Sequence, residues 1–419
     1  MNVDEKIDSY EDEEITKDRS IVEKTDCVLF LDNDKNWNSI KMREREAPVK
    51  PKLGKNRLEH PSSLIGEKWG TVFEVRGPTL KKIPTLAWDV ERQITLDNLD
   101  ETSRTGKDNR ELVDDNKSQK LTQKEIVSIR DQSEVSAEIL IDKLCENSTT
   151  FNTKHELTQK KYRGKKTKKH VQRYLMLSAD GWNTNELYFT KKSEKIMHMR
   201  MEALSQILTL ANLCPHNDTQ VLIVENCSGL VTGAVVERLG GLGRVFNGYS
   251  EKHPCISIAY DMLDLTAWAK TSIINFHLAL LTDTKLTKKE LNESWDSSAV
   301  CGERKVTLAN VKKWICDDLC DSLIICCEYD CLSLLQYLWP YLAPGNPFVV
   351  WSQHLQPLIQ VFQYLKTTNS GLAVNIRLYD NWFREYQVLP NRTRPILDMP
   401  QMGGYIVTGI KIIDLQENK

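Results

Sequence analysis

The sequence predicts an α/β protein in two folded parts. A small N-terminal β-barrel domain carries a helical appendage, and a doubly wound sheet follows it. Three observations lead to this prediction. Short, glycine-punctuated strand patterns fill residues 25–95, a polar stretch with helix patterns comes next, and helices alternate with strands from residue 195 onward. A chain of 419 residues, 40% hydrophobic, can form two or three cores.

Composition narrows the class of protein. The net charge is −2, so any affinity for nucleic acid must come from local patches and not from the total field. Residues 1–22 are acidic and polar, which predicts a disordered tail without a secretory signal. No apolar run approaches the roughly 20 residues that a bilayer span needs. We therefore expect a soluble intracellular protein.

The 11 cysteines are scattered through apolar segments. They lack the paired short spacings that a zinc site requires, so packing is the expected role and no metal is predicted.

The N-terminal domain is expected over residues 23–157. "DCVLFLD" and "SLIGEKWGTVFEV" are its clearest strands. A polar linker at about 98–125 leads into a helix, where Thr122 precedes Glu125 by three residues, the spacing of a capping box. A second helix, "VSAEILIDKLCENST", completes the appendage. Residues 158–194 are expected to form a basic segment with connecting strands.

The second domain is expected over residues 195–419, with a polar insertion at about 283–305. A helical stripe opens it, formed by Met197, Met201, Leu204, Leu208 and Ala211. Buried strands are predicted at "QVLIV", "GRVFNGYS", "DSLIICC" and "PFVVWSQ", with helices between them. "AVNIRLY" and "GGYIVTGIKII" predict a closing antiparallel pair. A doubly wound sheet that ends this way is typical of class I methyltransferases, by analogy of fold.

The turn after "QVLIV" is where such a fold would hold its cofactor. Glu225 closes the strand, and of the three glycines expected in the turn only Gly229 is present, because Cys227 and Val231 occupy the other two positions. A β-branched Val231 is expected to resist positive φ and to narrow the space for a ligand. The next strand offers only Glu251, late, as a ribose-binding carboxylate. We predict a turn kept for folding, without a working cofactor site.

No catalytic residue is predicted. The segment "LIICCEYDCLS", where adenine methyltransferases often carry a proline-containing motif or an aspartate, has no proline. Glu328 or Asp330 could act as a base. A carboxylate at a strand end is more often a helix cap or a solvated residue.

A dense basic run predicts contact with a polyanion. Candidate RNA-binding residues in it are Lys160, Lys161, Arg163, Lys165, Lys166, Lys168, Lys169 and Arg173. A nuclear import signal or a solvated helix face are the alternatives. Arg377 and Arg384 are further candidates, beside Trp382 and Tyr386, and a protein interface is favoured for these aromatic residues.

Several stretches resemble a known family. They are "TGKDNRELVDDNKSQKLTQKEI", "ENSTTF", "GTVFEV", "KIMHMR" with "LTLANL", and "YQVLPNRTRP". Together they resemble the non-catalytic subunits of the tRNA (adenine-58-N1)-methyltransferase over nearly the whole chain beyond the tail. The turn "ENCSGLVTG" is similar to the degenerate turn of that family.

The resemblance implies a β-barrel domain and a methyltransferase-like domain that has lost methyl-donor binding. It implies pairing with a homologous catalytic subunit that binds S-adenosylmethionine, assembly of two heterodimers into a heterotetramer, and a nuclear location. It also implies tRNA binding, methylation of N1 of adenine 58 in the T-loop, and a link to initiator-tRNA maturation. The short insertion and Glu328 depart from the family pattern. Two rival hypotheses are an active S-adenosylmethionine-dependent RNA methyltransferase with an atypical cofactor loop, and a protein scaffold.

Overall fold

A computed structural model defines two compact units. It describes residues 19–33, 35–42, 52–53, 56–58, 60–76, 79–85, 118–131, 137–152, 154, 156–282, 294–295, 306–368, 371–388, 393–399 and 402–413. One unit lies within Asp18–Ser178 and Glu385–Leu397, and the other within Ala179–Arg384 and Asp398–Lys419. Most of the acidic tail, of the 98–125 linker and of the 283–305 insertion lies outside the described residues.

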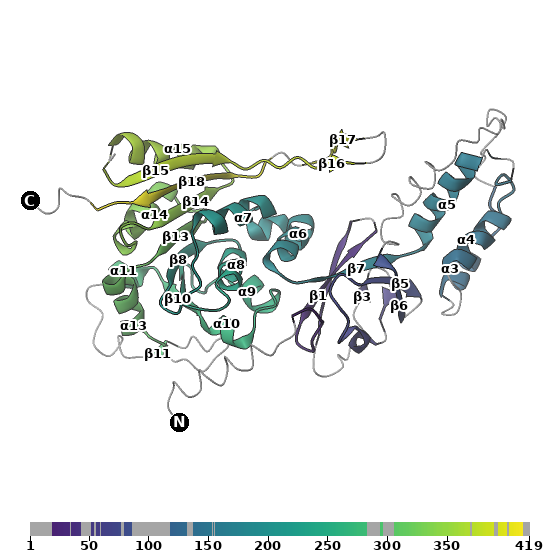
Figure 1. Ribbon diagram of the computed structural model, residues 1–419, viewed down its shortest axis with the longest axis horizontal. Helices are drawn as coiled ribbons and strands as arrows, with labels where there is room; N and C mark the ends of the chain where they lie inside the picture. Colours follow the sequence, from purple (N-terminus) through teal and green to yellow (C-terminus); the bar gives the residue numbers. More distant parts are fainter. Residues whose placement is uncertain are drawn as a thin grey trace, which may run out of the picture. The chain divides into compact units, whose positions relative to one another are not determined.

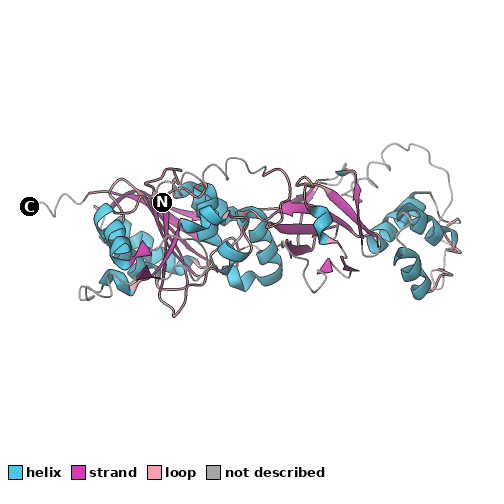
Figure 2. Cartoon of the chain, turned by 90° about the horizontal axis from the view of Figure 1, so that it is seen from below, coloured by secondary structure: helices cyan, strands magenta, loops and turns pink. Residues whose placement is uncertain are grey.

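The first unit is built on an antiparallel sheet (Figures 1 and 2). Its five strands have the order β2-β1-β7-β5-β6. They are β1 (Cys27–Asp32), β2 (Trp37–Lys41), β5 (Val72–Arg76), β6 (Thr79–Ile83) and β7 (Arg173–Ser178). A short pair, β3 (Lys52–Leu53) and β4 (Asn56–Arg57), lies in the same unit. In the core of this unit the rings of Phe30 and Tyr174 meet edge to face, with their centres 6.2 Å apart, so β1 and β7 contribute to the same apolar core.

Three helices of the appendage lie among the described residues, where two were expected. They are α3 (Gln123–Asp131), α4 (Ala137–Glu146) and α5 (Glu156–His170). Ile126, Leu140, Leu144 and Val171 form their buried core. The predicted capping box is confirmed at the start of α3, where the Thr122 amide donates to the Glu125 carboxylate at 2.7 Å and the Glu125 amide donates to the Thr122 hydroxyl at 3.4 Å.

The basic run therefore forms a helix, α5, followed by the central strand β7. Strands within residues 158–170 are not observed, and the boundary between the two units falls at Ser178 and not near residue 195. The reason is long-range pairing: β7 inserts between β1 and β5, so residues 173–178 complete the N-terminal sheet.

The second unit is a mixed seven-stranded sheet with the order β10-β9-β8-β13-β14-β18-β15. Its strands are β8 (Gln220–Glu225), β9 (Arg244–Tyr249), β10 (Ile273–His277), β13 (Ser322–Cys326), β14 (Pro347–Ser352), β15 (Ala373–Asp380) and β18 (Tyr405–Lys411). Pairing is parallel from β10 to β14, and β18 is antiparallel to both neighbours. The predicted closing pair is thus confirmed. Between its strands in the sequence comes a small hairpin of β16 (Tyr386–Gln387) and β17 (Arg394–Pro395), which belongs to the first unit.

Helices cover both faces of this sheet, as the buried strand patterns require (Figure 1). One face carries α6 (Gly181–Lys192), α7 (Met201–Leu210), α8 (Leu230–Arg238), α9 (Ser257–Asp261) and α10 (Ala267–Thr271). The other carries α11 (Ala279–Thr282), α13 (Leu308–Lys313), α14 (Cys331–Leu338) and α15 (Leu355–Gln363). Alternate residues of β8 point to opposite sides, with Val221 and Ile223 in one core and Leu222 and Val224 in the other.

Two local predictions need correction. The helix expected from residue 196 begins at Met201, because Met197 and His198 adopt left-handed φ values of 51° and 54°. "VTLANVKKWICDDL" is not one helix: it starts with β12 (Val306–Thr307), paired with β11 (Ser294–Trp295), and ends in a π-helical turn at Trp314–Asp318.

The described part of the chain contains no helix with the length and apolarity of a bilayer span. Its cysteines are free thiols, and no cluster of histidine, cysteine and carboxylate side chains there could hold a metal ion.

Candidate functional site

The turn between β8 and α8 lies at the carboxyl edge of the sheet. Ser228 and Gly229 make the turn, with φ values of 58° and 87°. A Cβ at Gly229 would lie 2.8 Å from the Cα of Ile256, so glycine is required because the chain crosses directly over the turn. The Ile258 amide, which donates to the Ser228 carbonyl at 2.9 Å, fixes that crossing.

The prediction that Val231 narrows the space for a ligand at the turn is wrong. Val231 lies in the first turn of α8, and both Val231 and Cys227 are fully buried in the core of the sheet. Neither residue occupies a left-handed position, and the residue that lies over the turn is Ile256. Ile256 could not be identified from local sequence patterns, because the contact joins segments that are far apart in the chain.

The Glu225 carboxylate binds the first turn of α8. It accepts hydrogen bonds from the Val231 amide at 3.2 Å, from the Thr232 amide at 2.6 Å and from the Thr232 hydroxyl. Burial raises the pKa of Glu225, and the bonds from Thr232 and Val231 offset only part of that effect. The carboxylate at the end of β8 is therefore engaged by the first turn of α8.

Glu251, the late candidate for ribose binding, is also engaged within the chain. The Tyr329 hydroxyl donates to its carboxylate, and the Asn226 side-chain amide donates at 3.5 Å. The bond from Tyr329 is the main reason that the pKa of Glu251 is lowered. The Ser250 hydroxyl donates to the Tyr329 oxygen at 2.7 Å. Polar groups at this edge thus satisfy one another, in a network that includes Tyr329, which sequence reasoning did not single out.

The two carboxylates after β13 do not form a catalytic pair. Asp330 caps α14, as predicted: it accepts from the Ser333 amide at 2.8 Å and from the Ser333 hydroxyl, which together lower the pKa of Asp330. Glu328 is exposed, and its backbone amide donates to the Asn226 side-chain oxygen at 3.2 Å.

The basic run divides into residues with different surroundings. Lys161, Lys165 and Lys169 are exposed on α5 and follow each other at intervals of four residues, which places them on one face about 6 Å apart along the axis. We call these three residues the lysine stripe. They are the members of the run best placed to meet an external anion.

Other members of the run already have partners. Arg163 forms an ion pair with Asp142 of α4. Lys166 lies over the Tyr162 ring at 5.2 Å, and Lys160 also makes contacts within the protein. Arg173 is on β7, mostly buried, with its Nε 3.8 Å from the Glu74 carboxylate. The Lys168 side chain lies outside the described residues.

The second group of candidates belongs to the other unit. Arg377 is on β15, where its guanidinium donates to the Tyr379 hydroxyl at 3.4 Å. The Arg384 guanidinium lies 5.7 Å from the centre of the Trp382 ring. These two arginines and the lysine stripe thus belong to different units of the chain.

The strand order, the antiparallel β18 and the strand–turn–helix at Glu225 define a class I methyltransferase fold. Within that class the chain belongs to the Gcd10p family, whose model matches residues 21–312.

Relatives of known name are similar over most of their length. The tRNA (adenine(58)-N(1))-methyltransferase non-catalytic subunit trm6 of Dictyostelium discoideum is 31% identical, covering 95% of this chain and 80% of the relative. The subunit of the same name from Mus musculus is 28% identical, covering 84% and 81%. That from Schizosaccharomyces pombe is 25% identical, covering 87% of each chain.

Solved structures are more distant. A SAM-dependent O-methyltransferase of Thermotoga maritima aligns with a TM-score of 0.49 at 11% identity, covering 96% of this chain and 98% of that one. The tRNA (m1A58) methyltransferase TrmI of Aquifex aeolicus aligns with a TM-score of 0.40 at 13% identity, covering 57% and 79%.

Proposed function

We propose that this chain is the non-catalytic, tRNA-binding subunit of the complex that methylates N1 of adenine 58 in the T-loop of tRNA. A catalytic paralogue completes the complex and holds the S-adenosylmethionine that supplies the methyl group. The observation that carries this proposal is similarity, over most of both chains, to subunits named as non-catalytic in three distant organisms. No methyl-transfer step is assigned to residues of this chain.

The geometry of the turn supports a subunit without a working cofactor site. A nucleotide needs a free backbone surface at the turn and a free carboxylate for its ribose hydroxyls. Here Ile256 lies over Gly229, and the Glu225 and Glu251 carboxylates are bonded to groups of the chain itself. These residues do not fit the methyl donor. A duplicated fold of this kind can still supply a surface that matches its catalytic sibling.

We also propose the following assignments. The lysine stripe, with Lys160, Lys166 and Lys168 from the same basic run, contacts the phosphate backbone of tRNA without reading bases. Arg377 and Arg384, in the other unit, are separate candidates for contact with RNA. We further propose that the sheet β2-β1-β7-β5-β6, whose edge strands β2 and β6 are not paired with each other in the described residues, belongs to a small β-barrel. Two heterodimers form a heterotetramer, and the complex works in the nucleus.

Calorimetry with S-adenosylmethionine tests the proposal. We expect no binding heat from the purified chain alone, because its turn is occupied by its own groups. We expect saturable binding and methylation of adenine 58 once the catalytic paralogue is added. The paralogue alone, at the same concentration, is the control. Micromolar binding to the isolated chain would contradict the proposal and favour the active-enzyme alternative.

A further inference from the structure

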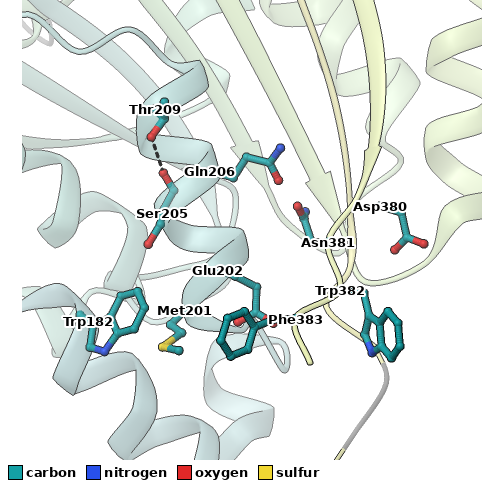
Figure 3. Close-up of a pocket in the computed structure, with 10 residues that line it drawn as sticks. All are labelled: Trp182, Met201, Glu202, Ser205, Gln206, Thr209, Asp380, Asn381, Trp382 and Phe383. Carbon is teal, nitrogen blue, oxygen red and sulfur yellow. Dashed lines mark hydrogen bonds between the residues drawn. The ribbon is translucent and has the colours of Figure 1, made fainter. Parts of the chain in front are cut away.

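A groove with aromatic walls lies at the end of β15, away from the turn at Glu225. Its volume is about 510 Å³. Figure 3 shows α7 on one side and the segment after β15 on the other. The lining residues that matter for binding are Trp182, Glu202, Asp380, Asn381, Trp382 and Phe383.

Three large aromatic side chains of this groove are exposed to water. Trp182, Trp382 and Phe383 are 49%, 52% and 46% exposed. Large apolar side chains gathered in this way mark interaction sites, and tryptophan is enriched among the residues that dominate binding energy. The guanidinium of Arg384 lies against the Trp382 ring and helps to hold it in place.

A buried amide in the wall points to a ligand independently. Asn381 is 5% exposed, yet its side-chain nitrogen has no hydrogen-bond partner among the described residues. The segment around it is fixed, because the Asn381 amide donates to the Gly404 carbonyl at 3.1 Å and a Cβ at Gly403 would lie 1.6 Å from the Asn381 carbonyl oxygen. A bound acceptor, such as a main-chain carbonyl, would satisfy the amide nitrogen.

The charges in the groove favour a protein over a nucleic acid. Asp380 and Glu202 both line the groove, but Glu202 already pairs with Arg200. Asp380 has no ion-pair partner in the described part of the chain, so its carboxylate is the charge that repels phosphate groups and attracts a basic side chain. Aromatic walls with an acidic edge therefore fit a peptide segment that carries an apolar residue beside a lysine or arginine.

The neighbouring edge strand extends the apolar surface. β15 pairs only with β18 among the described strands, and Val374 and Leu378 on it are 46% and 37% exposed. The pairing register shifts between Val374 and Arg377, so the outer edge is not a regular ladder for strand addition. Docking at this place thus depends on the side chains of the groove.

We propose that the groove is a docking site for an apolar and basic segment of the catalytic paralogue. This inference rests on the proposed function, which supplies the partner. Asn381 donates to a main-chain carbonyl of that segment, the three aromatic residues pack on its apolar side chain, and Asp380 pairs with its cation.

Binding of the full chain to the purified paralogue tests the proposal, measured by interferometry. The double variant Trp382→Ser, Phe383→Ser is expected to lower the affinity for the paralogue at least tenfold. Asp380→Lys is also expected to lower this affinity, and its effect should be larger at low salt than at high salt. Ile139→Ser, which replaces a side chain of similar exposure (47%) on α4, is the matched control and should stay within twofold of wild type. If the double variant fails to fold, Trp182→Ser on the opposite wall carries the test.

The outcomes separate the two levels of inference. If wild type binds the paralogue and the groove variants bind equally well, the docking site is wrong while the proposed subunit role stands. If the groove variants lose tRNA affinity but keep the paralogue, the groove binds RNA and the proposal is overturned. If wild type does not bind the paralogue, the proposed assembly itself fails, and the docking site with it.

Discussion

Replacing Lys161, Lys165 and Lys169 together by glutamine is expected to weaken tRNA binding on the order of a hundredfold at about 50 mM salt. Each lysine that neutralises a phosphate releases counterions, which contributes about 0.7–0.9 to the slope of log affinity against log salt concentration. Three such contacts predict a slope that is shallower by about 2–3. Filter binding of the assembled complex at several salt concentrations measures it.

Arg163 provides a control from the same helix. Its guanidinium is already paired with Asp142, so Arg163→Gln should change the slope much less than Lys165→Gln, two residues further along. If the two variants changed the salt slope equally, the Arg163–Asp142 ion pair would have to open when tRNA binds. The distinction between paired and unpaired residues of the basic run would then be wrong.

Cell imaging separates RNA contact from a role in import. An import signal predicts that the triple lysine variant accumulates outside the nucleus while its salt slope stays unchanged. That combination would contradict the proposed RNA contact and support the scaffold alternative, in which the basic run serves import alone.

Local sequence patterns predicted the elements whose structure is set by local chemistry. The continuous apolar run "QVLIV" predicts a strand of a parallel sheet with both faces covered, and it forms β8. The Thr122–Glu125 spacing predicts a capping box, and these two residues form one. The closing pair of strands was predictable for the same reason, since each strand carries its own apolar pattern.

Features that depend on distant segments could not be predicted in this way. β7 joins the N-terminal sheet only because β1 and β5 lie on either side of it. Ile256, which lies over the turn, and Tyr329, which donates to Glu251, both come from other loops. The basic run could be found from its charge, but its division into a free stripe and paired arginines depends on where Asp142 and Glu74 lie in space.

Glu225→Ala is expected to destabilise the second unit by about 3 kcal/mol. The substitution removes the acceptor for two backbone amides and one hydroxyl at the buried start of α8, and each buried donor left without a partner costs about 1–3 kcal/mol. Relief of the buried charge offsets part of that loss. Urea unfolding followed by tryptophan fluorescence measures the change.

Asp330→Ala is the matched control, because Asp330 makes the same kind of contact at the exposed start of α14. Its loss should cost about 1 kcal/mol. Similar losses at both positions would contradict the role of burial at Glu225.

The two carboxylates should also respond to pH in opposite directions. The pKa of Glu225 is raised above 4.5, so protonation of this buried group contributes stability that is fully present below that pH and is lost as pH rises through the folded pKa. The hydrogen bonds that the group accepts from α8 are a separate contribution. The pKa of Asp330 is lowered from 3.8, so its contribution is present above that value and is lost as pH falls through the folded pKa. Unfolding of wild type against Glu225→Gln and Asp330→Asn across this range measures both trends.

Activity distinguishes a structural Glu225 from a ligand-binding one. At a temperature where the variant remains folded, a complex that contains Glu225→Ala should methylate tRNA with unchanged kcat and unchanged KM for S-adenosylmethionine. That result is expected because the described partners of this carboxylate belong to its own turn and to the start of α8, and in the proposed complex the paralogue holds the methyl donor. If only the KM for S-adenosylmethionine rose, at a temperature where the variant is as fully folded as the wild type, the turn would still take part in binding the methyl donor. The steric closure by Ile256 would then have to open in the complex.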